Sequence, residues 1–270
     1  MTDRSATLAS VYRYPVKSMM GEELNAAQIT SEGLFGDRSY ALCDTQTGKV
    51  VSAKNPKKWP SMFRYRAVDV TPPVAGSAMP AVRVTLPDGA TAVSSNPDFA
   101  PALSATLGRP VTLLAKPPES PQLEEFWPDR EALASPDAIT DEAMPPGTFF
   151  DLAILHVLTT GTLNRLAELE PRGRFEPRRF RPNLIIDTGE QQGFVENDWI
   201  GKTVAIGPEV RIRVTGPCPR CVMTTLAQSD LPRDPAILKA AAQYNEGHVG
   251  IYGSVVTAGT VRVGDTIQVA

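Results

Sequence analysis

Two of the chain's three cysteines stand three positions apart, in the stretch GPCPRCVMTT. A C-x-x-C pair can be half of a zinc site, a redox-active dithiol, or the setting for one thiolate ligand. The pair is Cys218 and Cys221, and Arg220 directly precedes the second thiol. Because a neighbouring guanidinium favours the thiolate over the thiol, Cys221 is the better candidate for a soft-metal ligand or a nucleophile.

The other chemistries of a cysteine pair need partners that this sequence does not offer nearby. A zinc ion in a structural site needs four ligands, and the remaining candidates Cys43, His156 and His248 are isolated along the chain. A thioredoxin-like pair begins a helix, whereas this one follows a β-like segment and precedes β-branched and threonine residues. The sequence favours a single thiolate ligand, leaves zinc and dithiol chemistry open, and places Cys43 and His156 in the core.

Basic residues in three short motifs are the second feature that could do chemistry. They are Lys17 with Ser18 in YPVKS, Arg38 in FGDRSYAL, and Arg181 in RRFRPNLII. Arginine binds phosphate through two parallel hydrogen bonds and lysine adds a point charge, so these cations at strand ends indicate an anionic ligand. Pro182 predicts an extended backbone at Arg181.

Composition limits the function classes. The chain has 270 residues, 42% hydrophobic and 21% charged, as in soluble globular proteins. A net charge of −3 provides no basic field for nucleic acid. No apolar run is long enough for a membrane span, and three cysteines indicate a reducing, cytoplasmic compartment. Arg178 and Arg179, beside the third basic motif, are interpreted as surface charge.

The elements that must position these residues are mostly short strands. Apolar β-branched runs between turn signals predict strands at 82–86, 110–114, 183–187, 202–207 and 210–216. Apolar spacing and capping residues predict helices at 96–107, at 160–169 with Thr160 or Thr162 as cap, and at 235–244 after Asp234. The fold class is therefore mostly β with few short helices. We expect a β domain at 1–115, a linker or loop rich in Pro, Glu and Asp at 116–147, and a second β domain at 148–270.

Several motifs in order carry a resemblance to a known family. YPVKS and GDRSY match the N-terminal domain of the MOSC proteins, while FRPNLII, GPCPRCVMTT and GTVRVGDTI match the MOSC domain itself. MOSC proteins are named for the C-terminal domain of molybdenum cofactor sulfurases. Within this family, the chain looks like the mitochondrial amidoxime reducing component and its bacterial relatives. The resemblance implies a MOSC N-terminal β-barrel-like domain at 1–115 and a MOSC β-barrel at 148–270.

The resemblance also implies roles for single residues. Cys221 would be the protein's catalytic ligand to the molybdenum of the molybdenum cofactor (Mo-molybdopterin), and Cys218 a bystander. The residues implied to bind the cofactor are Lys17, Ser18, Arg38, Leu152, Ala153, Arg181, Asn183, Pro219, Arg220 and Tyr252. Leu152 and Ala153 would do so through their backbone, and Asn183 would orient the strand end after Arg181.

The activity implied is that of a molybdenum-dependent oxidoreductase that reduces N-hydroxylated or N-oxide compounds. Electrons would come from an external ferredoxin- or cytochrome-type protein with its reductase. Relatives with this activity carry an acidic residue where this chain has Ala227, which leaves the substrate open. Two alternatives remain: a sulfur carrier or sulfurtransferase that uses a Cys221 persulfide, and a carrier of molybdenum cofactor.

Overall fold

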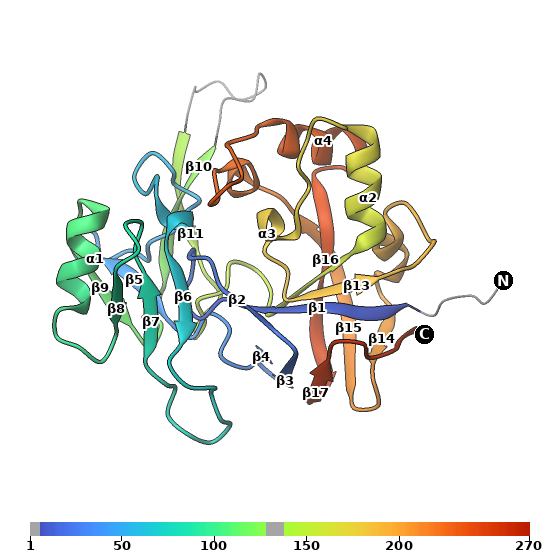
Figure 1. Ribbon diagram of the computed structural model, residues 1–270, viewed down its shortest axis with the longest axis horizontal. Helices are drawn as coiled ribbons and strands as arrows, with labels where there is room; N and C mark the ends of the chain where they lie inside the picture. The colour runs from blue at the N-terminus through green and yellow to red at the C-terminus, as the bar shows by residue number, and fades with distance from the viewer. Residues whose placement is uncertain (1–5, 128–137) are drawn as a thin grey trace. The chain divides into compact units, whose positions relative to one another are not determined.

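The computed structural model describes residues 6–127 and 138–270, which are mostly β as predicted (Figure 1). They fall into two compact units that interleave along the chain. The first comprises the chain up to Arg13, Glu23–Phe35 and Ala153–Ala270, and the second Tyr14–Glu22 and Gly36–Leu152. Neither unit is a continuous stretch of sequence, whereas the sequence analysis divided the chain linearly.

An eight-stranded sheet forms the basis of the first unit. In spatial order its strands are β18 (Ile267–Val269), β14 (Thr203–Ile206), β15 (Val210–Pro219), β16 (His248–Thr257), β12 (Leu155–Thr159), β13 (Leu184–Asp187), β1 (Thr7–Arg13) and β2 (Glu22–Leu24). Strands β12 and β13 run parallel, and the long crossover that a parallel pair requires contains α2 (Thr160–Leu169). This crossover carries the RRFRPN motif to the start of β13.

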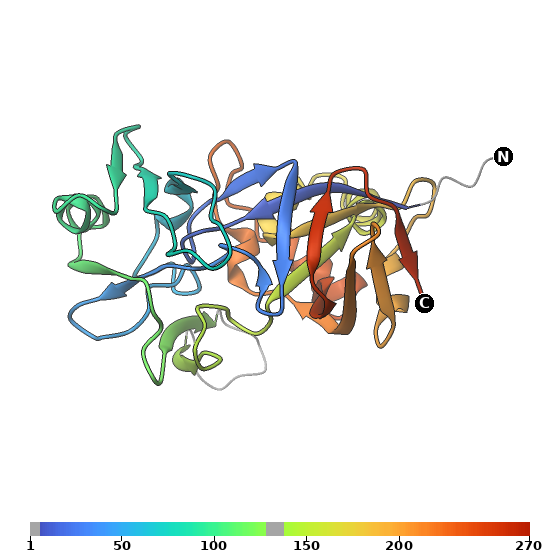
Figure 2. The ribbon, with the colours of Figure 1, turned by 90° about the horizontal axis from the view of Figure 1, so that it is seen from below.

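Strands β1 and β18 of this sheet meet at an isolated bridge between Thr7 and Thr266. Backbone hydrogen bonds of 2.8 Å from Leu8 N to Asp265 O and 2.9 Å from Ile267 N to Ala6 O flank it. The start of β1 and the labelled C-terminal end of the chain accordingly lie on the same side of this unit (Figure 2). Over the described residues, the expected MOSC β-barrel is thus an open sheet joined at one bridge, and continuous strand pairing does not close it.

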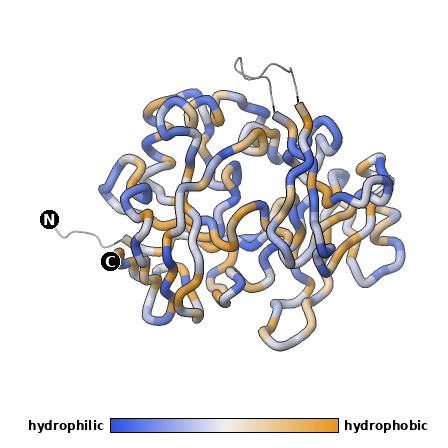
Figure 3. The backbone as a smooth tube through the Cα atoms, turned by 180° about the vertical axis from the view of Figure 1, so that it is seen from behind, coloured by the Kyte–Doolittle hydropathy of each residue, from blue (hydrophilic) through white to orange (hydrophobic). Residues whose placement is uncertain are grey.

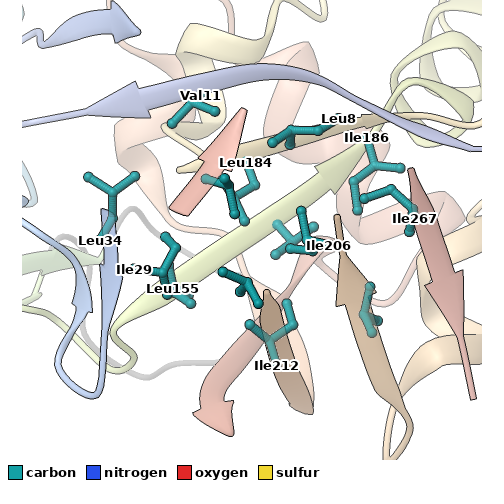
Figure 4. Packing of buried hydrophobic residues seen from close by; sticks show 14 of the residues in the cluster. Leu8, Val11, Ile29, Leu34, Leu155, Leu184, Ile186, Ile206, Ile212 and Ile267 are labelled. Carbon is teal, nitrogen blue, oxygen red and sulfur yellow. The ribbon is translucent and has the colours of Figure 1, made fainter. Parts of the chain in front are cut away.

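The core of the first unit lies against this sheet. Along β14 and β15 buried residues alternate with more exposed ones, because successive side chains of a strand point to opposite faces. The buried side chains converge in a single cluster, of which Figure 4 shows Leu8, Val11, Ile29, Leu34, Leu155, Leu184, Ile186, Ile206, Ile212 and Ile267. A smaller sheet of β17 (Gly259–Arg262), β3 (Ala26–Thr30) and β4 (Gly33–Leu34) contributes to the same cluster.

Short helices make a second apolar cluster in the first unit. They are α2, α3 (Pro177–Phe180) and α4 (Ala236–Tyr244), and the same unit also contains the 3₁₀ turns η2 (Val195–Trp199) and η3 (Val222–Thr225). The helix predicted at 160–169 is confirmed with the same bounds, but Thr159 is its cap, because Thr159 Oγ1 accepts a hydrogen bond of 3.1 Å from Thr162 N. The helix predicted after Asp234 is confirmed as well, and Asp234 Oδ1 accepts from Ala236 N at 2.9 Å.

The second unit is built from shorter sheets. Its elements are β5 (Ala41–Asp44) paired with β9 (Val111–Leu114), β10 (Gln122–Trp127) paired with β11 (Ala138–Ala143), the three-stranded sheet of β6 (Arg66–Asp69), β7 (Val82–Thr85) and β8 (Thr91–Val93), the helix α1 (Phe99–Leu107) and the 3₁₀ turn η1 (Met62–Arg64). Helix α1 lies within the predicted 96–107 and ends at Gly108 in the left-handed conformation. Leu123 and Phe149 belong to one buried apolar cluster among the described residues of this unit.

Residues 116–127 and 138–147 differ from the expected linker or loop, because they contain β10 and β11, while residues 128–137 of the predicted linker lie outside the described residues. The two strands pair antiparallel along their whole length. The acidic composition concealed these strands, since their carboxylates are used in ion pairs. Lys58 Nζ lies 3.1 Å from Glu124 Oε2, and Lys54 Nζ lies 2.9 Å from Glu125 Oε2. Lys54 and Lys58 thereby neutralise carboxylates that a sequence pattern assigns to solvent.

Hydropathy changes over short distances along the chain, with apolar and polar stretches alternating along the tube (Figure 3). This is typical of short strands joined by turns. Strands β7, β9, β13, β14 and β15 occupy the five predicted positions. Within the described ranges, no helix combines the length and the apolar character needed to cross a bilayer.

Candidate functional site

Three predicted site residues, Lys17, Ser18 and Arg38, lie in the second unit. Together with Asp151, which was not predicted, they are here called the lysine–arginine cluster. Lys17 is 4% exposed, and its Nζ donates to Asp151 Oδ1 at 2.6 Å and to Phe149 O at 2.8 Å. An ammonium group has three N–H donors, and these contacts within the described residues use two of them.

Opposing charges determine the electrostatics of this cluster. Burial lowers the pKa of Lys17, and the nearby Asp151 carboxylate opposes that shift only in part. Burial would raise the pKa of Asp151, but the charges of Lys17, Lys54 and Arg38 outweigh it and hold that pKa well below its usual range. Asp151 is therefore ionised at neutral pH and is the counter-ion of the cluster.

Arg38 is the second cation of the cluster. Its guanidinium donates to Asp37 Oδ2 and lies 4.7 Å from the centroid of the Tyr14 ring and 5.9 Å from that of Phe150. Asp37 is fixed in turn, since its Oδ1 accepts from Tyr14 N at 2.7 Å. Burial disfavours the charged guanidinium, but Asp37 outweighs this effect and raises the pKa of Arg38. Such a side chain can hold an anion without losing its own charge.

Backbone conformation distinguishes three predicted site residues. Ser18, Arg38 and Arg181 have φ angles of 63°, 48° and 56°. A residue with a Cβ in this left-handed region costs about 1–2 kcal/mol, and such conformations cluster at functional sites. At Ser18 a side-chain contact supports it, because Ser18 Oγ accepts from Ala53 N at 3.1 Å.

Arg181 corrects a prediction, because its backbone is left-handed and the extended conformation expected before Pro182 is not adopted. Arg181 ends α3, and its N–H bonds to Pro177 O at 3.1 Å. This bond and the burial of the side chain, 6% exposed, override the local preference. Asn183 follows, with Oδ1 accepting from His156 N at 3.1 Å and Nδ2 donating to Tyr12 O at 3.3 Å. Asn183 thereby ties the start of β13 to β12 and to the end of β1.

The second group, here called the thiol region, consists of Cys218, Arg220 and Cys221 in the first unit. Cys218 is 1% exposed on β15, whereas Cys221 is half-buried and caps η3. Arg220 Nη1 donates to Cys218 Sγ at 2.7 Å, and Nη2 donates to Phe180 O at 2.8 Å. The sequence analysis linked this guanidinium to Cys221. Both thiols raise the pKa of Arg220 against the effect of its burial, and Cys218 has the larger influence.

The remaining predicted residues are spread more widely. Leu152 is 61% exposed at the end of the second unit, and Ala153 begins the last segment of the first. Pro219 is exposed at the end of β15. Tyr252 is half-buried on β16, opposite His156, with 6.0 Å between the two ring centroids. His156 is buried as predicted, whereas Cys43 lies on β5 but is only half-buried.

Sequence analysis missed three charged residues. Asp37 and Asp151 are the carboxylate partners described above; Asp37 lies within the motif FGDRSYAL, and Asp151 directly precedes the predicted residue Leu152. The interpretation of Arg179 as surface charge was wrong, since Arg179 is fully buried. Arg178 is 27% exposed and pairs with acidic residues. A helix of four residues has too little periodicity to show which of two adjacent arginines faces inward.

The donor set fits a metal that needs only one protein ligand. Within the described part of the chain, no three His, Cys, Asp or Glu side chains come together as a metal site. A molybdenum ion held by its own pterin requires one thiolate, and Cys221 is the more accessible thiol of the pair. Arg220 Nε is buried without a hydrogen-bond partner among the described residues, so it can donate to a bound group. The residues present therefore fit the molybdenum cofactor.

Family models match both parts of the chain. The model of the MOSC domain matches residues 148–268, and that of the MOSC N-terminal beta barrel domain matches residues 5–97. The chain belongs to the MOSC family. MOSC domains are known in molybdenum cofactor-binding proteins, so this is a molybdenum-cofactor-associated family.

Comparisons with individual proteins are less informative than the family models. No curated protein matches the chain. Similar solved structures include the YUAD protein from Bacillus subtilis, 14% identical, covering 98% of this chain and 95% of that one with a TM-score of 0.48. YiiM from Geobacillus stearothermophilus is 18% identical, covering 44% of this chain and 54% of that one with a TM-score of 0.33. YiiM from Escherichia coli is 20% identical with the same coverage and a TM-score of 0.32. We draw no functional conclusion from likenesses this distant.

Proposed function

We propose that this MOSC protein binds molybdenum cofactor through the Cys221 thiolate and reduces N-hydroxylated or N-oxide compounds. Electrons would come from a separate ferredoxin- or cytochrome-type protein with its reductase. Family membership supports the association with molybdenum cofactor. The activity and the donor are the parts that we propose.

The observation that carries this proposal is the difference between the two thiols of the CPRC motif. Cys218 is buried and accepts a hydrogen bond from Arg220, whereas Cys221 is half-buried at the cap position directly before the 3₁₀ turn η3. A metal ligand needs a thiolate that an incoming group can reach, and Cys221 meets this condition. The same contrast argues against a dithiol that reacts as a symmetrical pair.

The chain's own residues would bind and orient. In the second unit, Lys17 and Arg38 offer positive charge and N–H donors to an anion such as phosphate. In the first unit, Arg220 offers its buried Nε beside Cys221. When bound, the molybdenum cofactor supplies the two-electron chemistry that converts an N–OH group to an amine and water. We assign no proton donor among the side chains, and the substrate class follows from the family resemblance.

The deciding experiment is elemental analysis of protein made in a host that synthesises the cofactor. We expect about one molybdenum per chain in the wild type, because one thiolate ligand holds one metal. Cys221→Ser should lose the metal almost completely. Cys218→Ser is the matched control and should keep most of it. Equal loss in both variants, or zinc in place of molybdenum, would contradict the proposal.

Two further assays separate the alternatives. Reduction of an amidoxime and of an N-oxide by the molybdenum-loaded protein, with a chemical electron donor, tests the enzyme against a cofactor carrier. Loaded protein that turns over neither substrate would be a carrier. Cyanide-releasable sulfur on Cys221 in protein without molybdenum would establish the sulfur carrier instead.

A further inference from the structure

The segment that follows Cys221 ends in a tight turn, residues 226–232, here called the 226–232 turn. Gln228 and Leu231 form an antiparallel bridge with backbone hydrogen bonds of 2.9 Å and 2.8 Å. Ser229 between them has φ of 51°. The turn is therefore a defined hairpin, and it is connected to Cys221 only through η3.

The side chain of Arg179, from α3, bonds to backbone carbonyls of the segment that follows Cys221. Its side chain is fully buried, and Nε donates to Arg174 O at 2.8 Å. Nη2 donates to Pro232 O at 3.0 Å, while Nη1 lies 3.4 Å from Thr224 O and 3.3 Å from Leu226 O. The guanidinium thus holds the chain on both sides of the 226–232 turn.

The chemistry of these contacts explains why arginine occupies the position. A buried cation is costly unless its donors are bonded, and here backbone carbonyls accept from all three nitrogen atoms of the guanidinium. A planar fork can reach several carbonyls in different directions, which a single ammonium group cannot do with the same geometry. Arg179 is therefore placed to fix backbone.

The neighbouring arginines act differently. Arg174 and Arg178 pair with Asp230 at 3.0 Å and 2.7 Å, and the Asp230 side chain is 59% exposed. Exposed ion pairs of this kind contribute little, because water screens them. Fixation of the turn consequently depends on Arg179, and Arg178 provides a matched control one residue away.

A side chain of the thiol region also contacts α3. Arg220, directly before Cys221, donates through Nη2 to Phe180 O and lies over the Phe180 ring at 5.6 Å. Arg179, directly before Phe180, reaches the residues after Cys221. The chain is thus fastened to α3 on both sides of the thiol.

We propose that Arg179 is a positioning residue for Cys221: it fixes the backbone that follows the thiol and so holds the thiol in one orientation. The relevance of Arg179 to metal binding rests on the proposed function, whereas its effect on the orientation of the thiol does not. Arg179 itself is assigned no contact with a reacting atom. It acts through η3 and the 226–232 turn.

The test is the alkylation rate of Cys221 in metal-free, full-length protein, followed by iodoacetamide labelling and peptide mass spectrometry. Arg179→Met removes the donors, and Arg179→Lys keeps the charge without the fork. In both variants we expect Cys221 to react faster, by about tenfold for Met and less for Lys, because local opening exposes the thiol. Rates are taken across pH, so that the plateau at high pH reports access and the midpoint reports the thiol pKa. The plateau should rise.

Cys43, in the second unit, is the internal reference, and Arg178→Met is the control variant. In Arg178→Met, the labelling rate of Cys221 relative to that of Cys43 should be the same as in the wild type. Unchanged Cys221 rates in folded Arg179 variants would overturn the proposal, and so would equal acceleration of Cys43 and Cys221, which reports global loosening. If neither Arg179 variant folds while Arg178→Met does, Arg179 serves overall stability and the positioning role is refuted.

These outcomes are distinguishable from failure of the proposed function. The labelling assay contains no molybdenum, and the metal analysis contains no Arg179 variant. Faster labelling in Arg179 variants together with a molybdenum-free wild type would keep the positioning role and remove the metal site. Unchanged Cys221 labelling in the Arg179 variants together with about one molybdenum per chain in the wild type would remove the positioning role and keep the metal site.

Discussion

The cations of the lysine–arginine cluster bond to carboxylates, whereas Arg220 of the thiol region and Arg179 of α3 bond to backbone carbonyls and a thiol. Lys17 bonds to Asp151 and Arg38 to Asp37, so that cluster carries its own counter-ions. Arg179 bonds to carbonyls, and Arg220 to a carbonyl and Cys218. In the first arrangement, the cations keep a positive charge that can also interact with an anionic ligand. The second fixes backbone around a reactive group.

The largest expected effect concerns the counter-ion of the first arrangement. Asp151→Asn leaves Lys17 buried without its carboxylate, and we expect a loss of about 2 kcal/mol in the free energy of unfolding. This is below the value for a fully buried pair, because the Asp151 side chain is 32% exposed. Denaturant unfolding at neutral pH measures it. Asp141→Asn, which breaks the pair of Lys49 with a side chain 51% exposed, is the control and should change little.

The pH dependence of the same variant sharpens the comparison. The folded-state pKa of Asp151 lies below its unfolded value, so its contribution is present above about pH 4 and is lost as the pH falls through the folded pKa. The difference between wild type and Asp151→Asn should therefore shrink in acid. A difference that stays constant down to low pH would mean that charge is not its cause.

A smaller effect is expected from Arg220→Lys in the thiol region. Lysine keeps the charge but cannot contact both Cys218 Sγ and Phe180 O, so about 1–2 kcal/mol of unfolding free energy should be lost. Denaturant unfolding measures the loss, and labelling of Cys218 should become faster. Arg213→Lys, at an exposed position on β15, is the matched control. If Arg220→Lys behaves like it, charge alone holds the thiol region together.

The smallest effect concerns the left-handed residues. Ser229 is exposed, and Ser229→Gly should raise the unfolding free energy by about 0.5 kcal/mol, since glycine relieves the strain but adds entropy to the unfolded chain. Ser18→Gly should give no gain, because it also removes the hydrogen bond from Ala53 N to Ser18 Oγ. Thermal unfolding of both variants is the measurement. If Ser18→Gly instead raises the unfolding free energy, the hydrogen bond from Ala53 N does not compensate the backbone strain at Ser18.

Sequence by itself determined the mostly β fold class, five strand positions, the three helices and the family, because short apolar runs, caps and motifs are local patterns. It also identified Lys17, Ser18, Arg38, Arg181, Arg220 and Cys221 as residues of interest. Tertiary structure alone decided their partners. Asp151 lies 134 positions from Lys17, and Thr224 lies 45 positions from Arg179.

The corrected predictions share one physical reason. The backbone of Arg181 and the burial of Arg179 depend on which carbonyls and side chains surround α3, a helix too short to carry a pattern of its own. In the same way, the acidic residues of β10 were assigned to a loop because their lysine partners lie far away in the sequence. Local pattern determines which elements form, whereas long-range pairing determines which charges are buried and what they hold in place.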